Sequence, residues 1–464
     1  MILPKDFIEQ TIHILGKDQF SLFEEGLNSE APVSIRINEK KATLEEFSYL
    51  NIKDKIKWSH SGYYLSERPS FTFDPLFHAG CYYVQEASSM FIEKAIKTYI
   101  KNPVTYLDLC AAPGGKTTLA YSALPEGSFV VCNEIMRNRA NILAENMTKW
   151  GADRVIVTNN PSEDFTVLKD TFDVILTDVP CSGEGMFRKD PVAIDEWSAD
   201  NVKMCAIRQQ GIIDNIWNAL KPGGILIYST CTYNLEENEE NVHYIVNKYD
   251  AEVLPVDTES YPEITGALKY EYPVYRFMPH KTLGEGFFMA VIRKPDTEYP
   301  APYQLKEKKT KGKKGSKETI VKVPDILTDW IIDKRKFEIV AVNDTFIAIP
   351  VDAMDLYKTI QFHLRIVKAG INLAQIKGKD IIPEHALAMS LQLNKELFAR
   401  EELDYENAIQ FLRKEAITLD ESTPRGYVLV TYKNKPLGWM KNIGNRANNL
   451  YPQEWRIRSQ FNNK

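Results

Sequence analysis

At 464 residues the chain is long enough for roughly two to four domains with a sizeable core. Its 44% hydrophobic and 26% charged residues are ordinary for a soluble globular protein, and no apolar run approaches the roughly 18 residues that cross a membrane. Six cysteines do not make a disulfide framework in so long a chain, and the first residues lack the pattern of a secretion signal. We therefore expect free thiols and a cytoplasmic location.

The net charge of -6 is unevenly distributed. Seven lysines and one acid lie between Lys306 and Lys317, and eight Lys/Arg with one acid lie between Arg425 and Lys464. An acidic body with a basic linker and a basic C-terminal module suits binding to phosphates, whereas a solvated tether and basic surface is the plainer interpretation. The distribution favours RNA as a partner.

The predicted elements begin with a small α/β cap over residues 1–65. Residues 33–38 alternate like a half-buried strand, with Arg36 and Asn38 on one face, and residues 85–99 carry apolar residues at helical spacing. A regular alternation of strands and helices follows, which predicts a parallel sheet wrapped by helices. Its strands are expected at 104–109, 128–133, 155–158, 172–178 and 225–229, with residues 221–224 forming the turn into the last of them.

Beyond this core, the Lys-rich stretch cannot bury an apolar face and is typical of a linker. Residues 346–350 indicate a strand within a mixed region, and residues 427–432 and 437–439 flank a turn in a β-rich end. We expect five segments: 1–65, a cap; 66–295, the core; 296–320, the linker; 321–400, a small α/β domain; and 401–464, a basic domain.

A glycine-rich turn, DLCAAPGGKTT (108–118), joins the first core strand to its helix. Glycines allow a ligand to approach the backbone, and a helix N-terminus favours a carboxylate. The turn is neither GxGxxG nor a P-loop, and Glu134 closes the second strand, where an acid accepts ribose hydroxyls. A nucleoside without a polyphosphate fits best, and S-adenosylmethionine is the leading candidate; the alternative is a structural turn with an incidental acid.

Two cysteines follow predicted strands: Cys181 in DVPC (178–181) and Cys231 in STC (229–231). If the strands are neighbours in a parallel sheet, both thiols emerge at its carboxyl edge. Cytosine C5 is a poor nucleophile until a thiolate adds to C6, and a second group must then remove the C5 proton. Asp178 is placed to engage N3 and the exocyclic amine. Two thiols without further ligands do not make a zinc site.

The remaining cysteines, Cys81, Cys110, Cys132 and Cys205, are expected to be structural. Asn234 and Glu237 are spaced like a capping box. We therefore interpret the acids of residues 236–240 as a solvated helix start and expect no metal.

DLCAAPGGKTT, DVPCSGEGMFRKDP and YSTCTYNLEENEENV resemble the Sun-type family of RNA 5-methylcytosine methyltransferases. HAGCYYVQEASSM (78–90) and GEGFFMAVIRK (284–294) are similar, more narrowly, to its bacterial small-subunit rRNA methyltransferase F branch. The resemblance implies a Rossmann-like class I methyltransferase core, an N-terminal cap that binds RNA, a C-terminal β-rich PUA-like RNA-binding module, and small-subunit (16S) rRNA as substrate. We expect a monomer.

The resemblance also implies roles that the residues alone leave open. Cys231 would be the C6 nucleophile, and Cys181 would assist product release. The family's S-adenosylmethionine contacts match Cys110, Ala111, Ala112, Pro113, Gly114, Gly115, Lys116, Glu134 and Asp178. Many relatives carry an acid after the third strand, where this chain has TNNP (158–161), so Asn159 or Asn160 would substitute there.

Three other functions compete with this hypothesis. In a DNA cytosine-C5 methyltransferase Cys181 would attack and Cys231 would be idle, so trapped adducts of cysteine variants distinguish the two. A catalytically silent RNA-binding assembly factor would transfer no methyl group, although the thiols, glycine turn and acids are intact. Exocyclic-amine methyltransferases need no thiol and commonly have a Pro-Pro-aromatic stretch where this chain has DVPC. The sequence leaves open the target cytosine, the activation of Cys231, and naked RNA versus assembled subunit.

Overall fold

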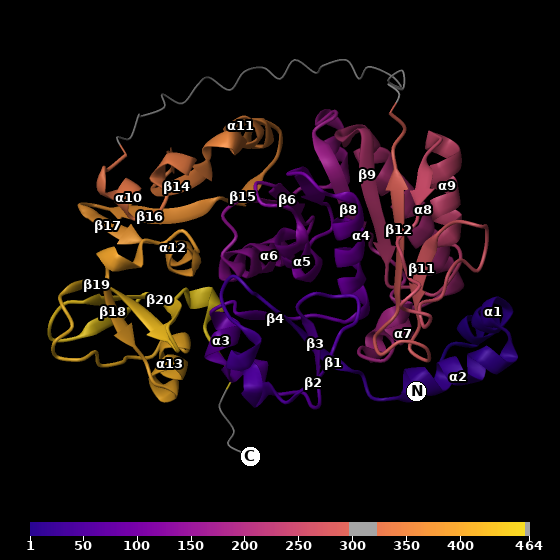
Figure 1. The fold of residues 1–464 in the computed structure, drawn as a ribbon, viewed down its shortest axis with the longest axis horizontal. Helices are drawn as coiled ribbons and strands as arrows, with labels where there is room; N and C mark the ends of the chain where they lie inside the picture. Colours follow the sequence, from indigo (N-terminus) through magenta and orange to yellow (C-terminus); the bar gives the residue numbers. More distant parts are fainter. Residues whose placement is uncertain (297–322, 460–464) are drawn as a thin grey trace.

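The computed structural model describes residues 1–296 and 323–459, so most of the predicted Lys-rich linker lies outside the described residues. A nine-stranded sheet forms the centre of the molecule (Figure 1), with the order β10-β12-β9-β8-β5-β6-β7-β15 and β11 paired to β12. The strands β5 to β9 run parallel to one another. The predicted class, a mostly parallel α/β core, is confirmed. The bounds are β5 Thr105–Asp108, β6 Phe129–Asn133, β7 Val155–Thr158, β8 Phe172–Asp178, β9 Leu220–Thr230, β10 Glu252–Leu254, β11 Val274–Phe277, β12 Phe287–Arg293 and β15 Ile366–Ala369.

Helices cover both faces of this sheet, as the alternation of apolar segments predicts. One face packs against α4 (Ile92–Tyr99), α5 (Gly115–Ala123) and α6 (Arg137–Trp150). The other packs against α8 (Ala199–Ile216), α9 (Glu239–Tyr249) and α11 (Met354–His363). The central strands are apolar and buried on both sides, which is the pattern of a parallel sheet covered by helices.

The structure differs from the sequence-based predictions in three local details. The predicted helix 85–99 is a 3-10 turn, η3 (Ser88–Phe91), followed by α4. The predicted turn at 221–224 is an irregularity inside β9, because its pairing jumps from Leu220 opposite Phe172 to Ile225 opposite Val174. The predicted half-buried strand, β1 (Val33–Ile37), is buried on both faces, because Arg36 donates to Gln85 and Thr118 and lies over the Trp150 ring.

Three smaller sheets complete the fold. β1 pairs with β3 (Gly62–Leu65) and β4 (Tyr82–Val84), and β3 pairs with β2 (Ile52–Lys55). After the linker, one sheet contains β13 (Phe337–Val342), β14 (Thr345–Pro350), β16 (Ile371–Lys377) and β17 (Asp380–Pro383). The last contains β18 (Ala399–Glu402), β19 (Gly426–Tyr432), β20 (Lys435–Asn442) and β21 (Ala447–Asn449), so the predicted β-rich end is confirmed.

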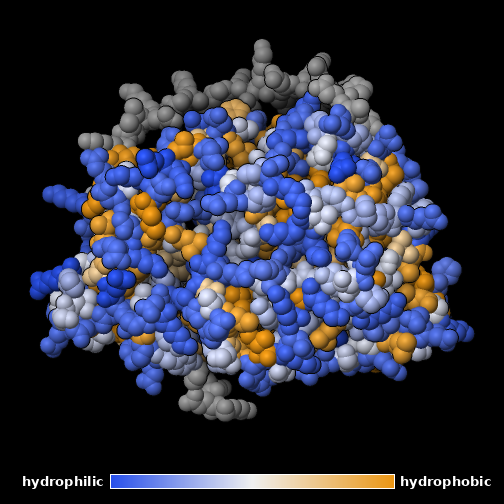
Figure 2. All heavy atoms as spheres, in the orientation of Figure 1, coloured by the Kyte–Doolittle hydropathy of each residue, from blue (hydrophilic) through white to orange (hydrophobic). Residues whose placement is uncertain are grey.

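The remaining helices join and cover these sheets. A pair, α1 (Lys5–Leu15) and α2 (Lys17–Asn28), lies below the core beside α7 (Pro191–Glu196) in Figure 1. The short helices are α3 (Pro75–His78), α10 (Ile326–Asp329), α12 (His385–Met389) and α13 (Tyr405–Leu412). The face in Figure 2 is mostly hydrophilic, with hydrophobic residues in small scattered patches. Within residues 1–296 and 323–459, no helix is both long enough and apolar enough to span a bilayer.

Candidate active site

The two cysteines meet at the carboxyl edge of the central sheet. β8 and β9 are parallel neighbours with Asp178 opposite Ser229, and each cysteine lies just beyond its strand. The two sulfurs are 3.0 Å apart, and both residues are free thiols. The predicted convergence of the thiols is therefore confirmed, whereas their separate roles stay predictions.

The thiol of Cys181 is in contact with the sulfur of Cys231. Its hydrogen bond with Cys231, followed by burial, raises the pKa of Cys181 well above the ordinary value. Either sulfur can be the donor of this contact.

Asp178 lies between the cysteine edge and the glycine-rich turn. Its Oδ2 accepts from Lys116 Nζ at 2.8 Å, and its Oδ1 accepts from Ser229 Oγ at 2.9 Å. Burial alone would lower the pKa of Lys116, but the charges of Asp178 and Cys231 raise it above its ordinary value. An ammonium group is thus held at the Asp178 carboxylate, which the sequence did not indicate.

The glycine-rich turn is built around a left-handed residue and a buried acid. Gly114 has φ 111° and caps α5, a conformation that side chains rarely adopt. Asp108, at the end of β5, is buried and accepts from Thr117 in the first turn of α5. Burial raises the pKa of Asp108 to about 7. The hydrogen bond from Thr117 to Asp108 therefore ties the first turn of α5 to the end of β5.

A cavity of about 590 Å³ opens at this edge, a size typical of small-molecule sites. Six predicted site residues line it: Cys110, Ala112, Glu134, Asp178, Cys181 and Cys231. The other predicted residues of the turn, Ala111, Pro113, Gly114, Gly115 and Lys116, lie outside this lining. The lining also contains residues that the sequence reasoning missed, among them Ile135, Met136, Arg139, Glu163, Arg208 and Ile212.

The carboxylates and the apolar walls of the cavity fit S-adenosylmethionine. Glu134 is buried at the end of β6, where its carboxylate accepts from the Met136 N–H and pairs with Arg139 at 3.3 Å. Apolar walls at Leu109, Ile135 and Ile212 suit a purine ring, and carboxylates suit a ribose diol and a sulfonium. Within the described ranges, no group of three or more His, Cys, Asp or Glu side chains could hold a metal ion.

Two asparagines follow the end of β7, and we expected one of them to take the place of an acid. The Asn159 amide donates to the carbonyls of Glu134 and Ile135, at 2.8 Å each. The Asn160 amide donates to Asp164, and its oxygen accepts from the Arg365 N–H at 2.9 Å. Both side chains make hydrogen bonds that hold the wall, and Asn160 lines the cavity together with Glu163.

The interpretation of residues 236–240 as a solvated helix start is wrong. Glu237, Asn238 and Glu239 are buried, and α9 begins at Glu239, not directly after Asn234. The Asn234 oxygen does accept from the Glu237 N–H at 2.8 Å, as a capping box requires. The Glu237 carboxylate, however, bonds the Asn234 amide instead of its backbone. The acids face an internal network because a loop packed against them supplies N–H donors.

Known proteins resemble this chain over nearly its whole length. The family model described as 16S rRNA methyltransferase RsmB/F matches residues 97–293, the RsmF N-terminal domain matches 3–87, and the RsmF PUA domain matches 399–457. Ribosomal RNA small subunit methyltransferase F of Enterobacter sp. (strain 638) is 30% identical, covering 98% of this chain and 96% of its own. The protein of the same name from Salmonella agona is 32% identical, covering 91% and 89%.

Solved structures share the fold of the core. A methyltransferase homolog protein from Pyrococcus horikoshii aligns with a TM-score of 0.55 and 29% identity, over 63% of this chain and 95% of that one. NSun6 from Pyrococcus horikoshii aligns with a TM-score of 0.55 and 21% identity, over 64% and 99%, and so shows the fold alone. With its paired cysteines, nucleoside-sized cavity and matching terminal domains, the chain belongs to the RsmB/F family of 16S rRNA methyltransferases, in its methyltransferase F branch.

Proposed function

We propose that this protein methylates C5 of cytosine in small-subunit ribosomal RNA through a covalent adduct between Cys231 and C6. The observation that carries the proposal is the pair of thiols 3.0 Å apart on the wall of the cavity, beside Asp178. S-adenosylmethionine, when bound, supplies an electrophilic methyl group. Methylation of an exocyclic amine would require no thiol at this edge, let alone two.

The protein's residues divide the chemistry between them. Cys231, whose sulfur lies 3.0 Å from that of Cys181, is the nucleophile that bonds C6. Asp178 engages N3 and the exocyclic amine, which favours the electron-rich C5 of the adduct. On release Cys181, as a thiolate, takes the C5 proton, the electrons of the C5–H bond reform the C5–C6 double bond, and the C6–sulfur bond breaks. The Cys231 thiolate is thereby regenerated.

The cofactor contacts remain those expected from the sequence. Glu134 accepts the ribose hydroxyls, and the turn from Cys110 through Ala111, Ala112, Pro113, Gly114 and Gly115 to Lys116 supports the amino-acid part. Ile135 and Ile212 on the cavity wall support this placement, because they lie where a purine would need apolar contact.

The flanking segments have a proposed role in substrate binding. We assign RNA contact to the cap, residues 1–65, and to the basic domain, residues 401–464, keeping the expected core (66–295) and intermediate domain (321–400). The partner is ribosomal RNA, free or within the small subunit, and the protein acts as a cytoplasmic monomer. Charge supports the C-terminal part of this assignment, since eight Lys/Arg and one acid lie between Arg425 and Lys464, whereas the assignment of the cap rests on its match to the RsmF N-terminal domain.

Replacing each cysteine tests the assignment. We expect Cys231→Ala to abolish methyl transfer from labelled S-adenosylmethionine and to form no adduct. Cys181→Ala is expected to trap a covalent protein–RNA species that survives denaturing electrophoresis. The reverse pattern would show that Cys181 attacks. Survival of every 5-methylcytosine in ribosomal RNA after deletion of the gene, mapped by bisulfite sequencing, would refute the substrate.

A further inference from the structure

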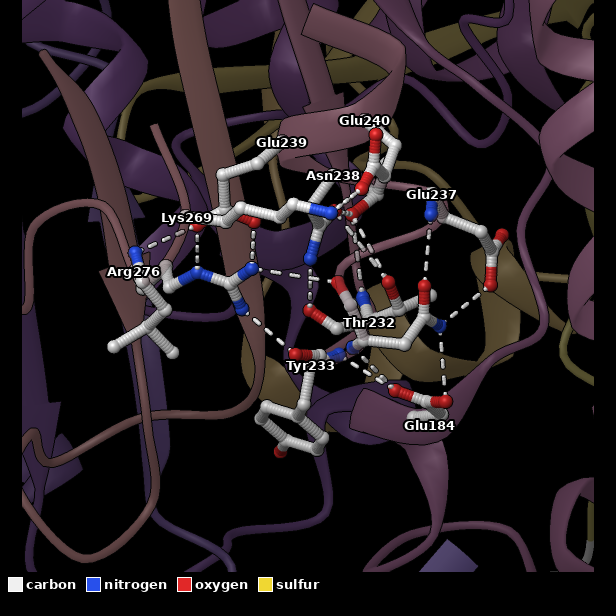
Figure 3. A network of polar contacts seen from close by, with 12 residues as sticks. Glu184, Thr232, Tyr233, Glu237, Asn238, Glu239, Glu240, Lys269 and Arg276 are labelled. Atoms are coloured by element: carbon white, nitrogen blue, oxygen red, sulfur yellow. Dashed lines mark hydrogen bonds and ion pairs between the residues drawn. The ribbon is translucent and has the colours of Figure 1, made fainter. Parts of the chain in front are cut away.

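Two buried carboxylates connect the loops that follow the two cysteines. Glu184 lies three residues after Cys181, and Glu237 lies six residues after Cys231; both are 0% exposed. Figure 3 shows both carboxylates beside the chain that follows Cys231. The Asn234 Nδ2 donates to both of them, at 2.9 Å to Glu184 and 2.8 Å to Glu237.

Glu184 belongs to the Cys181 loop but bonds the Cys231 loop. Its Oε2 accepts from the backbone N–H groups of Tyr233 at 2.6 Å and Asn234 at 3.0 Å. Its Oε1 also accepts from Trp197 Nε1 at 3.0 Å. Every partner is a donor, so these contacts suit the ionised carboxylate, which is the form present above the raised pKa of about 7 of Glu184, and a neutral side chain of the same shape would not be satisfied.

Glu237 makes the opposite connection. It belongs to the segment after Cys231, yet its carboxylate accepts from the Ser182 N–H at 3.0 Å, one residue after Cys181. Gln209 Nε2 donates to Glu237 at 2.7 Å and to the Pro180 carbonyl at 3.0 Å, so it braces the residue before Cys181. Each carboxylate thus holds the backbone next to the cysteine on the other loop.

We propose that Glu184 and Glu237 form a reciprocal clamp that sets the separation of Cys181 and Cys231. The clamp deepens the proposed function and rests on it for its catalytic consequence. Burying two carboxylates near each other is costly unless each charge has its donors, and here most of the donors are the backbone and side chains of the cysteine loops. The two glutamates are positioning residues, since they touch the cysteine loops and not the reacting atoms.

A direct connection between the loops supports the clamp. The Gly185 N–H donates to the Cys231 carbonyl at 2.7 Å. The N-terminal helices close the clamp from outside, because Phe7 packs edge-on against Trp197 and Phe23 against Tyr233. Trp197 and Tyr233 are both bonded to Glu184, so the loops have little freedom to separate.

The separation of the thiols can be tested without RNA or cofactor. Phenylarsine oxide bridges two neighbouring thiols, and its binding to the full-length protein is followed by intact mass. We expect Glu184→Gln and Glu237→Gln to bind it at least about tenfold more weakly than the unchanged protein. Cys181→Ala, which lacks one thiol, marks the level of no bridging. Glu93→Gln is the matched control, since Glu93 is a buried carboxylate that accepts from Ser59 and the His60 N–H in another part of the fold.

Methyl transfer then tests the catalytic consequence. For the glutamine variants, folded by circular dichroism and gel filtration, we expect kcat to fall about 10- to 100-fold while KM for S-adenosylmethionine stays unchanged. Glutamine variants that bind the arsenical as tightly as the unchanged protein would overturn the clamp. Variants that lose this binding but keep an unchanged kcat would overturn it as well. An unchanged protein that bridges the arsenical yet methylates no RNA would refute the proposed function and leave the thiol separation established.

Discussion

A single methyl group added at Gly185 should separate the two cysteines. A Cβ built on Gly185 would lie 2.5 Å from the Cys231 carbonyl oxygen and 2.9 Å from the Gly286 carbonyl, whereas ordinary contact begins at 3.4 Å. Both obstacles are backbone, so the Cys181 loop must move by about 1 Å, and a misplacement of that size costs about 100-fold in rate. Losing the Gly185 hydrogen bond adds about 1 kcal/mol of destabilisation.

The assay is the rate of methyl transfer to ribosomal RNA by Gly185→Ala, with the retained fold checked by circular dichroism. Gly211→Ala is the control, because a Cβ at Gly211 within α8 meets nothing within 4 Å. An alanine there should leave the rate unchanged and should stabilise the helix by about 1 kcal/mol. A folded Gly185→Ala protein with unchanged turnover would show that the spacing of the two loops does not limit the reaction.

Three further changes have defined outcomes. Glu134→Gln should weaken S-adenosylmethionine binding about 10- to 100-fold in calorimetry, because a charge-assisted hydrogen bond to the ribose is lost; unchanged affinity would remove Glu134 from the site. Lys116→Met should lower kcat by at least about tenfold, because it removes the ammonium that holds the Asp178 carboxylate at 2.8 Å; an unchanged kcat would contradict this. Burial raises the pKa of Glu184 from 4.5 to about 7. Between these two pH values the folded state holds a proton that the unfolded state has lost. The free energy of unfolding should therefore fall by on the order of 3 kcal/mol as the pH rises from 4.5 to about 7. The unfolding temperature of Glu184→Gln should therefore fall less between about pH 5 and about pH 8, and equal slopes would contradict the assignment.

The sequence predicted the convergence of the thiols because parallel strands end at one edge. Once residues 172–178 and 225–229 are assigned to neighbouring strands, the positions of Cys181 and Cys231 follow from chain geometry alone. Asp178 follows by the same reasoning. These predictions required only local periodicity and the rule for sheet edges.

The donors around the site could not be predicted in this way. The run of acids after Cys231 has the composition of a solvated helix start, and only a loop fifty residues earlier makes Glu237 a buried acceptor for the Ser182 N–H. The pairing of Lys116 with Asp178 likewise joins residues 62 positions apart. Such contacts depend on how loops pack, which local spacing does not encode.

The edge strand β15 has a consequence for biosynthesis. Ile366–Ala369 pairs with β7, and the backbone of Arg365 bonds Asn159 and Asn160, of which Asn160 lines the cavity. A ribosome making this protein must therefore translate past Ala369, well beyond the last of the parallel strands, before β7 is paired on both sides. Until then the nascent chain exposes an unpaired apolar strand, the kind of edge that recruits other strands. The cavity wall and the pairing of the β7 edge are thus completed together, late in synthesis.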